Sequence, residues 1–230
     1  MKSIDPVPTE VIVSFSGGKD SLATLDWCAR HFQKIYAFYM YWVKGLEFQE
    51  NTLRWAERTY DLKILRLPHW EIPRIMSQQI LNYYRPASPE FKQLRLRQVE
   101  DYARYKLTGD LSIWMASGEK KTDGMARRGL LNTRGPWDEQ RGHFYPLQDW
   151  TDKMVWEYLR IRKIPTPWVY SVGVASRTSG FRGSYLHQIK QHFPKDYEKM
   201  LQVFPFLEAI RKRYELYGRV QGTVEQVAAV

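Results

Sequence analysis

The most constraining feature of this chain is the run VIVSFSGGKDS at residues 11–21. Its first residues are β-branched or aromatic and predict a buried strand, and the apolar spacing from Ser21 to Phe32 predicts a helix. The two glycines between them let the backbone turn sharply and bring its N–H groups close to an anion. The helix directs its positive end to the same point. We therefore expect a strand–loop–helix unit that binds phosphate through residues Ser14, Ser16, Gly17, Gly18, Lys19, Asp20 and Ser21.

Two charged side chains extend the chemistry of this loop. Lys19 supplies a mobile positive charge, and the carboxylate of Asp20 is an oxygen ligand suited to Mg²⁺. The spacing differs from the GxxxxGKS/T loop of kinases and GTPases, which excludes that class. An ordinary serine–glycine turn fits the letters alone, but the strand and helix around them favour a nucleotide-phosphate site.

Composition limits the alternatives. The chain has 230 residues, 43% hydrophobic and 26% charged, as expected for one α/β domain with an appendage or two small domains. No apolar run approaches the ~20 residues that cross a bilayer, and the N-terminal residues do not resemble a signal peptide. We therefore expect a cytoplasmic protein without a membrane partner. The net charge of +10 favours an anionic partner and leaves nucleic acid open as a substrate.

Cysteine and histidine give little further chemistry. The one cysteine, Cys28, excludes an intramolecular disulfide and is expected to be a small buried residue of the first helix. The five histidines lack metal-ligand spacing, and His143 is the one closest to a second candidate loop.

The remaining pattern predicts a doubly wound α/β fold with a mostly parallel sheet flanked by helices. Strands are expected at 34–42, 62–67 and 111–116, and helices at 48–60 and 91–107. The second of these helices is basic and amphipathic, with one side formed by Phe91, Leu94, Val99 and Tyr102. Helices at 184–192 and 196–217 form a C-terminal helical extension. We place a nucleotide-binding domain at residues 1–168 and the extension at 169–230.

A second basic loop, SGEKKTDGMARRG at residues 117–129, follows the strand predicted at 111–116. In a doubly wound sheet it emerges at the same edge as the first loop. Gly118 allows close approach of phosphate, and Gly118 and Asp123 are the candidate nucleotide-binding residues of this loop. Lys120 and Arg127 are candidate cations for phosphate or sulfate oxygens. A charged surface loop is the alternative interpretation.

These blocks resemble a known family. SGGKDS resembles the SGGxDS signature of the PP-loop ATP pyrophosphatases, also called the adenine nucleotide α-hydrolase-like superfamily. The second loop resembles a pattern of the branch that contains phosphoadenosine phosphosulfate (PAPS) reductase and the ATP sulfurylase small subunit, with Lys120 and Gly124 replacing an arginine and a serine. A third block, YPLQDWTDKMVWEYLRIRKIP at 145–165, predicts a structural helix capped by Thr151, with Met154, Val155, Tyr158 and Leu159 facing inward. The resemblance implies binding of ATP with Mg²⁺, cleavage of its α–β bond, and catalytic roles for Lys19, Asp20, Lys120 and Arg127.

Two departures from the family pattern matter. Val43, Lys44 and Gly45 replace an aspartate–threonine–glycine run after the second strand. Tyr170 and Gly173 keep a family-like frame, but the segment 171–180 lacks the reductase cysteine. Because reduction of a sulfonucleotide by thiol chemistry needs a thiolate, we reject that activity for this chain.

Three functions stay open at this point. The first is an enzyme that adenylates an acceptor, either sulfate or an oxygen of a nucleobase or macromolecule, with sulfur or further subunits supplied by a protein partner. The second is a non-catalytic module that binds ATP or PAPS. The third is a sulfonucleotide-dependent transferase.

Overall fold

The computed structural model describes residues 8–77, 94–172 and 181–218. Within them, the strands form one sheet with the order β3-β2-β1-β4-β6-β5. All neighbouring strands are parallel except β5, which runs antiparallel to β6. The predicted mostly parallel sheet is confirmed. Its strands are β1 (Glu10–Ser14), β2 (Lys34–Tyr41), β3 (Ile64–Pro68), β4 (Met115–Ala116), β5 (Trp137–Asp138) and β6 (His143–Phe144).

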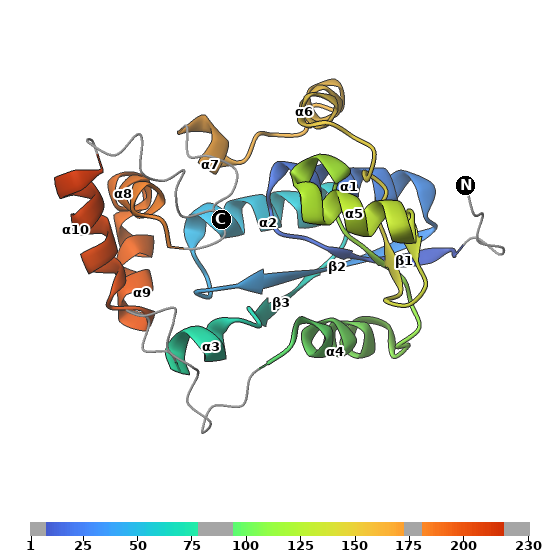
Figure 1. The fold of residues 1–230 in the computed structure, drawn as a ribbon, viewed down its shortest axis with the longest axis horizontal. Coiled ribbons are helices and arrows are strands. Elements are labelled where there is room, and N and C mark those ends of the chain that lie inside the picture. Colours follow the sequence, from blue (N-terminus) through green and yellow to red (C-terminus); the bar gives the residue numbers. More distant parts are fainter. Residues whose placement is uncertain (1–7, 78–93, 173–180, 219–230) are drawn as a thin grey trace.

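Helices cover both faces of this sheet, as a doubly wound fold requires (Figure 1). On one face lie α1 (Lys19–His31), α2 (Glu47–Tyr60), α5 (Met125–Arg134) and α6 (Asp152–Ile161). On the other lie α3 (Ile72–Ser77) and α4 (Leu96–Thr108). The connection from β3 to β4 includes α3 and α4 and runs over this second face, and β4 then enters the sheet beside β1. Loops after both strands therefore meet at the switch point where ligands bind in such sheets.

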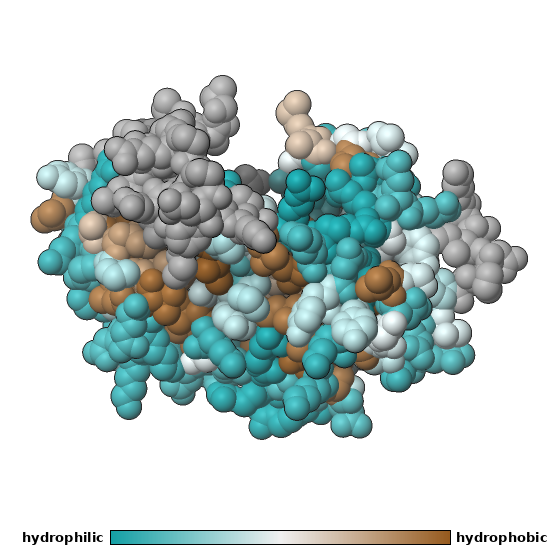
Figure 2. All heavy atoms as spheres, turned by 90° about the horizontal axis from the view of Figure 1, so that it is seen from below, coloured by the Kyte–Doolittle hydropathy of each residue, from teal (hydrophilic) through white to brown (hydrophobic). Residues whose placement is uncertain are grey.

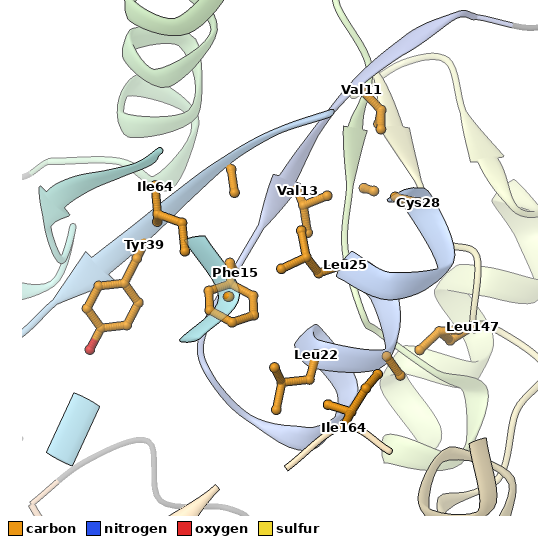
Figure 3. Packing of buried hydrophobic residues seen from close by; sticks show 14 of the residues in the cluster. Val11, Val13, Phe15, Leu22, Leu25, Cys28, Tyr39, Ile64, Leu147 and Ile164 are labelled. Atoms are coloured by element: carbon orange, nitrogen blue, oxygen red, sulfur yellow. The ribbon is translucent and has the colours of Figure 1, made fainter. Parts of the chain in front are cut away.

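The three central residues of β1, Val11 to Val13, are all apolar and buried because both faces of the strand are covered. Val13 lies close to Leu25 of α1, and Val11 is nearer to Cys28 of the same helix (Figure 3). Ile12 points the other way, into a cluster that contains residues of α4. The strand that carries the glycine loop is thus fixed from both sides, which gives the loop a rigid base.

The C-terminal extension packs against the carboxyl ends of the strands. It consists of α7 (Trp168–Ser171), α8 (Gly183–His192), α9 (Pro194–Val203) and α10 (Leu207–Tyr217). Its side chains share a hydrophobic cluster with Val43, Leu46 and Phe48, at the end of β2 and the start of α2. On the face shown in Figure 2, hydrophobic atoms gather mainly at the centre and toward the C-terminal helices on the left. The predicted extension is confirmed, and the boundary at residue 168 stays a prediction.

Three predictions about the helices of this protein were wrong. The helix predicted at 196–217 is two helices, because Pro205 has no N–H to donate and its ring clashes with a preceding turn. Tyr102 of α4 is 50% exposed and does not share the buried side of Val99. Met154 of α6 is 45% exposed, although Val155 and Leu159 are buried as expected.

The strand predicted at 111–116 is reduced to Met115–Ala116. Gly109 ends α4 with a φ of 75°, and the Asp110 carboxylate then accepts hydrogen bonds from the backbone N–H and the hydroxyl of Ser112. This turn delays the extended backbone and leaves Leu111 60% exposed. The start of the helix predicted at 91–107 lies outside the described residues. These resume at residue 94, and α4 begins at Leu96.

No helix in the described part of the chain is long and apolar enough to span a bilayer.

Candidate functional site

The glycine loop lies between the end of β1 and the start of α1. Gly17 has a φ of 74°, a left-handed conformation that favours glycine over any residue with a Cβ. Gly18 is the N-cap of α1 and offers no side chain to the first-turn N–H groups. Those N–H groups lack partners inside the helix and carry its positive dipole end. This backbone geometry is compatible with an anion, and phosphate binding by the loop stays a prediction.

The serines of the loop have different roles. The Ser16 hydroxyl donates to the Ser21 hydroxyl over 3.1 Å, and Ser21 donates to the carbonyl of Gly18 over 3.0 Å. Ser21 is buried and braces the loop from inside. Ser14 and Ser16 instead line a cavity, which leaves them available to a ligand.

Two lysines converge on Asp20. Lys19 Nζ lies 2.8 Å from Asp20 Oδ2, and Lys120 Nζ lies 2.6 Å from Asp20 Oδ1. Both ammonium groups are almost fully buried, with side chains 4% and 0% exposed. The structure thus brings together three predicted site residues, one of which is 100 positions away along the chain.

The sequence analysis missed the contribution of Asp152. Its Oδ1 lies 2.9 Å from Lys19 Nζ and 3.4 Å from Lys120 Nζ, at the start of α6. The hydrogen bond from Lys19, supported by Lys120, lowers the pKa of Asp152 below its ordinary value. Thr151 caps this helix as predicted by accepting the N–H of Met154. The helix begins beside the glycine loop, and Asp152 follows directly after the predicted cap in the third block. That position was the one signal in the sequence that pointed to it.

Gly118 allows the second basic loop to pack closely against α1. A Cβ at Gly118 would lie 2.9 Å from Thr24 Oγ1 and 3.0 Å from the backbone carbon and oxygen of Asp20. This glycine therefore serves the close packing of the loop on α1, and its predicted contact with phosphate stays untested. Beyond it, Lys120 is also bound by Asp123, whose Oδ1 lies 3.0 Å from Nζ.

The remaining candidate cation, Arg127, lies in α5 and forms an ion pair with Glu119. Its side chain is 39% exposed. The predicted contact of Arg127 with phosphate stays a prediction.

The charges of this network nearly cancel. Two ammonium groups face the carboxylates of Asp20, Asp123 and Asp152. Burial disfavours the charged form of Lys120, but its hydrogen bonds to Asp20 and Asp123 outweigh burial, and the pKa of Lys120 is raised. Lys120 is therefore charged at neutral pH, but three carboxylates face the two ammonium groups, so the network brings no net positive charge to the loop.

A cavity of about 340 Å³ opens beside the glycine loop. Ser14 to Gly18 form one side of it, and the opposite side is largely aromatic. There Trp42 and His69 stack with ring centroids 4.0 Å apart, and Phe181 packs edge-on against Trp42. Burial lowers the pKa of His69 to about 4, so its ring is neutral at physiological pH. The further lining residues are Tyr39, Met40, Val43, Leu46, Phe48, Gln49, Thr52, Leu53, Pro167, Trp168, Val169, Tyr170, Tyr185 and Met200.

The wall formed by α2 is held by the C-terminal extension. The N-cap residue Leu46 provides no side-chain hydrogen bond, and the buried carboxylate of Asp196 accepts the N–H of Phe48 over 3.1 Å instead. Lys199 donates to the carbonyl of Gly45 over 2.8 Å. Contacts from α9 therefore stabilise the segment 43–45, where the sequence departs from the family pattern.

A preformed metal cluster is absent from the described residues, in which no three histidine, cysteine or acidic side chains are placed to hold an ion. Asp20 as a magnesium ligand stays a prediction, because its two oxygens face Lys19 and Lys120. Cys28 is fully buried, and burial raises the pKa of its thiol. His143 pairs with Glu100 of α4 below the sheet.

Comparisons with known proteins identify a family and several similar proteins. Residues 10–185 match the family described as the phosphoadenosine phosphosulfate reductase domain. An uncharacterized protein of Methanocaldococcus jannaschii is 25% identical over 207 residues, which cover 85% of this chain and 41% of that relative. The chain thus spans about two-fifths of the length of the curated relative.

Three solved structures are more distantly similar. A PAPS reductase from Candida auris in a phosphate complex has a TM-score of 0.43 at 13% identity, covering 73% of this chain and 79% of that chain. A predicted subunit of tRNA methyltransferase from Methanocaldococcus jannaschii has a TM-score of 0.39 at 16% identity, covering 83% and 91%. An NH3-dependent NAD synthetase from Campylobacter jejuni in complex with nitrate has a TM-score of 0.43 at 13% identity, covering 94% and 90%.

Proposed function

Because the chain belongs to the phosphoadenosine phosphosulfate reductase domain family, we propose that it is an ATP-dependent adenylating enzyme of the PP-loop type. An acceptor oxygen attacks the α-phosphorus of ATP, the bond to the bridging oxygen breaks, and pyrophosphate leaves with the bonding electrons. The observation that carries this proposal is the uncapped N-terminus of α1, beside which Lys19 and Lys120 converge and a cavity opens.

The loop and the lysines have different roles in binding the phosphates. N–H groups at Gly18 and Lys19 bind oxygens of the departing pyrophosphate, and the ammonium groups of Lys19 and Lys120 stabilise the charge that develops as the bond breaks. Arg127 is a further candidate for this role. The cavity beside the loop takes the nucleoside, whose planar base fits between aromatic side chains.

The charge balance of the site supports a requirement for Mg²⁺. The two lysines are already neutralised by Asp20, Asp123 and Asp152, so the protein alone does not offset the charge of a triphosphate. Mg²⁺ is usually bound by one or two carboxylates together with substrate phosphates. Asp20 and Asp152, which share the Lys19 ammonium, are the carboxylates placed to contribute.

Thiol-based reduction does not fit this chain. The only cysteine lies in the core between α1 and the sheet, and a buried thiol with a raised pKa is inert. We therefore assign the site to cleavage of a phosphoanhydride, with an acceptor of sulfate or of an oxygen on a nucleic acid. The net charge of +10 supports an anionic acceptor. A protein partner would supply sulfur or a further subunit.

The test measures turnover by product release and nucleotide binding by calorimetry. The full chain is incubated with Mg·ATP and with sulfate, tRNA or a DNA oligonucleotide, and pyrophosphate and AMP are measured. Lys120→Met is compared with Lys121→Met, since the neighbouring Lys121 pairs with Asp149 at the surface instead of with Asp20. We expect Lys120→Met to lower the rate of pyrophosphate release by about 100-fold or more and Lys121→Met to leave it nearly unchanged. Thermal melts establish that both variants are folded.

The alternatives give different results. ATP binding with no pyrophosphate release for any acceptor favours a non-catalytic module. PAPS binding that is tighter than ATP binding in calorimetry favours a sulfonucleotide-dependent transferase. Absence of binding to either nucleotide refutes the proposed function.

A further inference from the structure

The hydroxyl of Tyr170 lies on the N–H group that an anion would use. The backbone N–H of Lys19, in the first turn of α1, donates to Tyr170 Oη over 3.2 Å. A Cβ built on Gly18 would lie 3.4 Å from the same oxygen. The phenol oxygen therefore stands directly over the glycine loop, where the helix N-terminus points.

Tyr170 takes part in both the aromatic cavity and the charged network beside the glycine loop. It lines the aromatic cavity, and its hydroxyl is close enough to Lys19, Asp20 and Asp152 to feel their charges. Its ring packs edge-on against Trp156 of α6, with centroids 5.0 Å apart. Burial raises the pKa of Tyr170, so the phenol is neutral and offers the loop an oxygen without a charge.

We propose that Tyr170 is a gate of the phosphate loop: its hydroxyl accepts the hydrogen bond of the Lys19 N–H and must leave before a phosphate oxygen binds there. One N–H group makes one well-directed hydrogen bond, and two oxygens cannot share the space over Gly18. A phosphate displaces the hydroxyl because hydrogen bonds to a charged oxygen are roughly twice as strong as neutral ones. The ligand admitted by this gate is the nucleotide phosphate of the proposed function, so the inference rests on that proposal.

The hydrogen bond from Lys19 to Tyr170 is expected to lower the affinity for phosphate without abolishing binding. Tyr170 belongs to α7, a four-residue turn that follows Pro167, whose ring fixes the backbone where the segment enters the site. Moving the side chain costs the hydrogen bond to Lys19 and part of the contact with Trp156. A net hydrogen bond of ordinary strength corresponds to about a 3- to 10-fold effect on affinity.

The test removes a single oxygen. Tyr170→Phe keeps the ring and its contact with Trp156, and Tyr105→Phe, at a 65% exposed position of α4, is the matched control. Binding of inorganic pyrophosphate and of Mg·ATP to the full chain is measured by calorimetry for the three proteins. We expect Tyr170→Phe to bind both ligands about 3- to 10-fold more tightly than wild type and Tyr105→Phe to match wild type.

Each other outcome is decisive. Equal or weaker binding by Tyr170→Phe overturns the gate, and weaker binding identifies the hydroxyl as a donor to the phosphate. In either case the proposed nucleotide site stands, since the wild-type protein binds. If none of the three proteins binds either ligand, the gate and the proposed function both fail.

Discussion

Replacement of Gly118 by alanine probes the contact that joins the two loops of the site. The added Cβ would lie 3.0 Å from the backbone carbon and oxygen of Asp20 and 2.9 Å from Thr24 Oγ1. Backbone atoms of α1 cannot move aside without moving the helix. Thr24 cannot rotate freely either, because its hydroxyl donates to the Asp20 carbonyl over 2.9 Å.

These distances set the size of the effect. Overpacking of a well-packed site costs typically about 1–3 kcal/mol. Rotation of Thr24 instead would cost its hydrogen bond, about 1 kcal/mol. We expect Gly118→Ala to lower the free energy of unfolding by about 2 kcal/mol. For a chain of this size, that loss lowers Tm by roughly 4–8 °C.

A second glycine provides the matched control. Gly129 lies inside α5, and a Cβ there would meet no atom within 4 Å. Alanine in a helix interior is about 0.5–1 kcal/mol more favourable than glycine, so Gly129→Ala is expected to stabilise the protein. Urea unfolding and thermal melts of both variants give the comparison. A Gly118→Ala protein within 0.5 kcal/mol of wild type would refute the reasoning, because the loop could then move away from α1 at little cost.

Two further predictions concern the walls of the cavity. Asp196→Ala leaves the N–H of Phe48 without its acceptor and is expected to lower the free energy of unfolding by about 2 kcal/mol, measured in urea. Asp196→Asn keeps an acceptor oxygen and is expected to retain most of that free energy. Equal losses in both variants would contradict this role. Burial lowers the pKa of His69 to about 4 from 6.5, so the unfolded chain binds this proton more tightly and stability falls as pH drops from 6.5 toward 4, by up to about 3 kcal/mol. His69→Phe, which cannot titrate, is expected to flatten the pH profile of unfolding in that range, and parallel profiles would count against it.

Local pattern was a sound guide to the first half of the sheet. Apolar runs separated by short polar turns predicted β1, β2, β3 and the helices between them within a few residues. Thr151 was also recognisable as a helix cap. Such features depend on neighbours in the sequence, and neighbours in the sequence are what a pattern describes.

The predictions failed where one residue outweighed a favourable run of neighbours. Apolar letters at 111–114 favoured a strand, but the turn at Asp110 delayed it. Helical spacing continued across 196–217, although Pro205 divides it. Spacing alone cannot weigh one proline or one side-chain hydrogen bond against a favourable run.

The sequence by itself determined the backbone of the phosphate loop. Adjacent glycines between a strand and a helix permit the left-handed turn at Gly17 and the uncapped start of α1, whatever surrounds them. Only the tertiary structure decided which side chains meet there. Lys120, Asp152 and Tyr170 come from positions at least 100 residues away, and they converge because strand ends and loops share one edge of a twisted sheet. The loop is local, whereas its charge balance and the oxygen above it are properties of the fold.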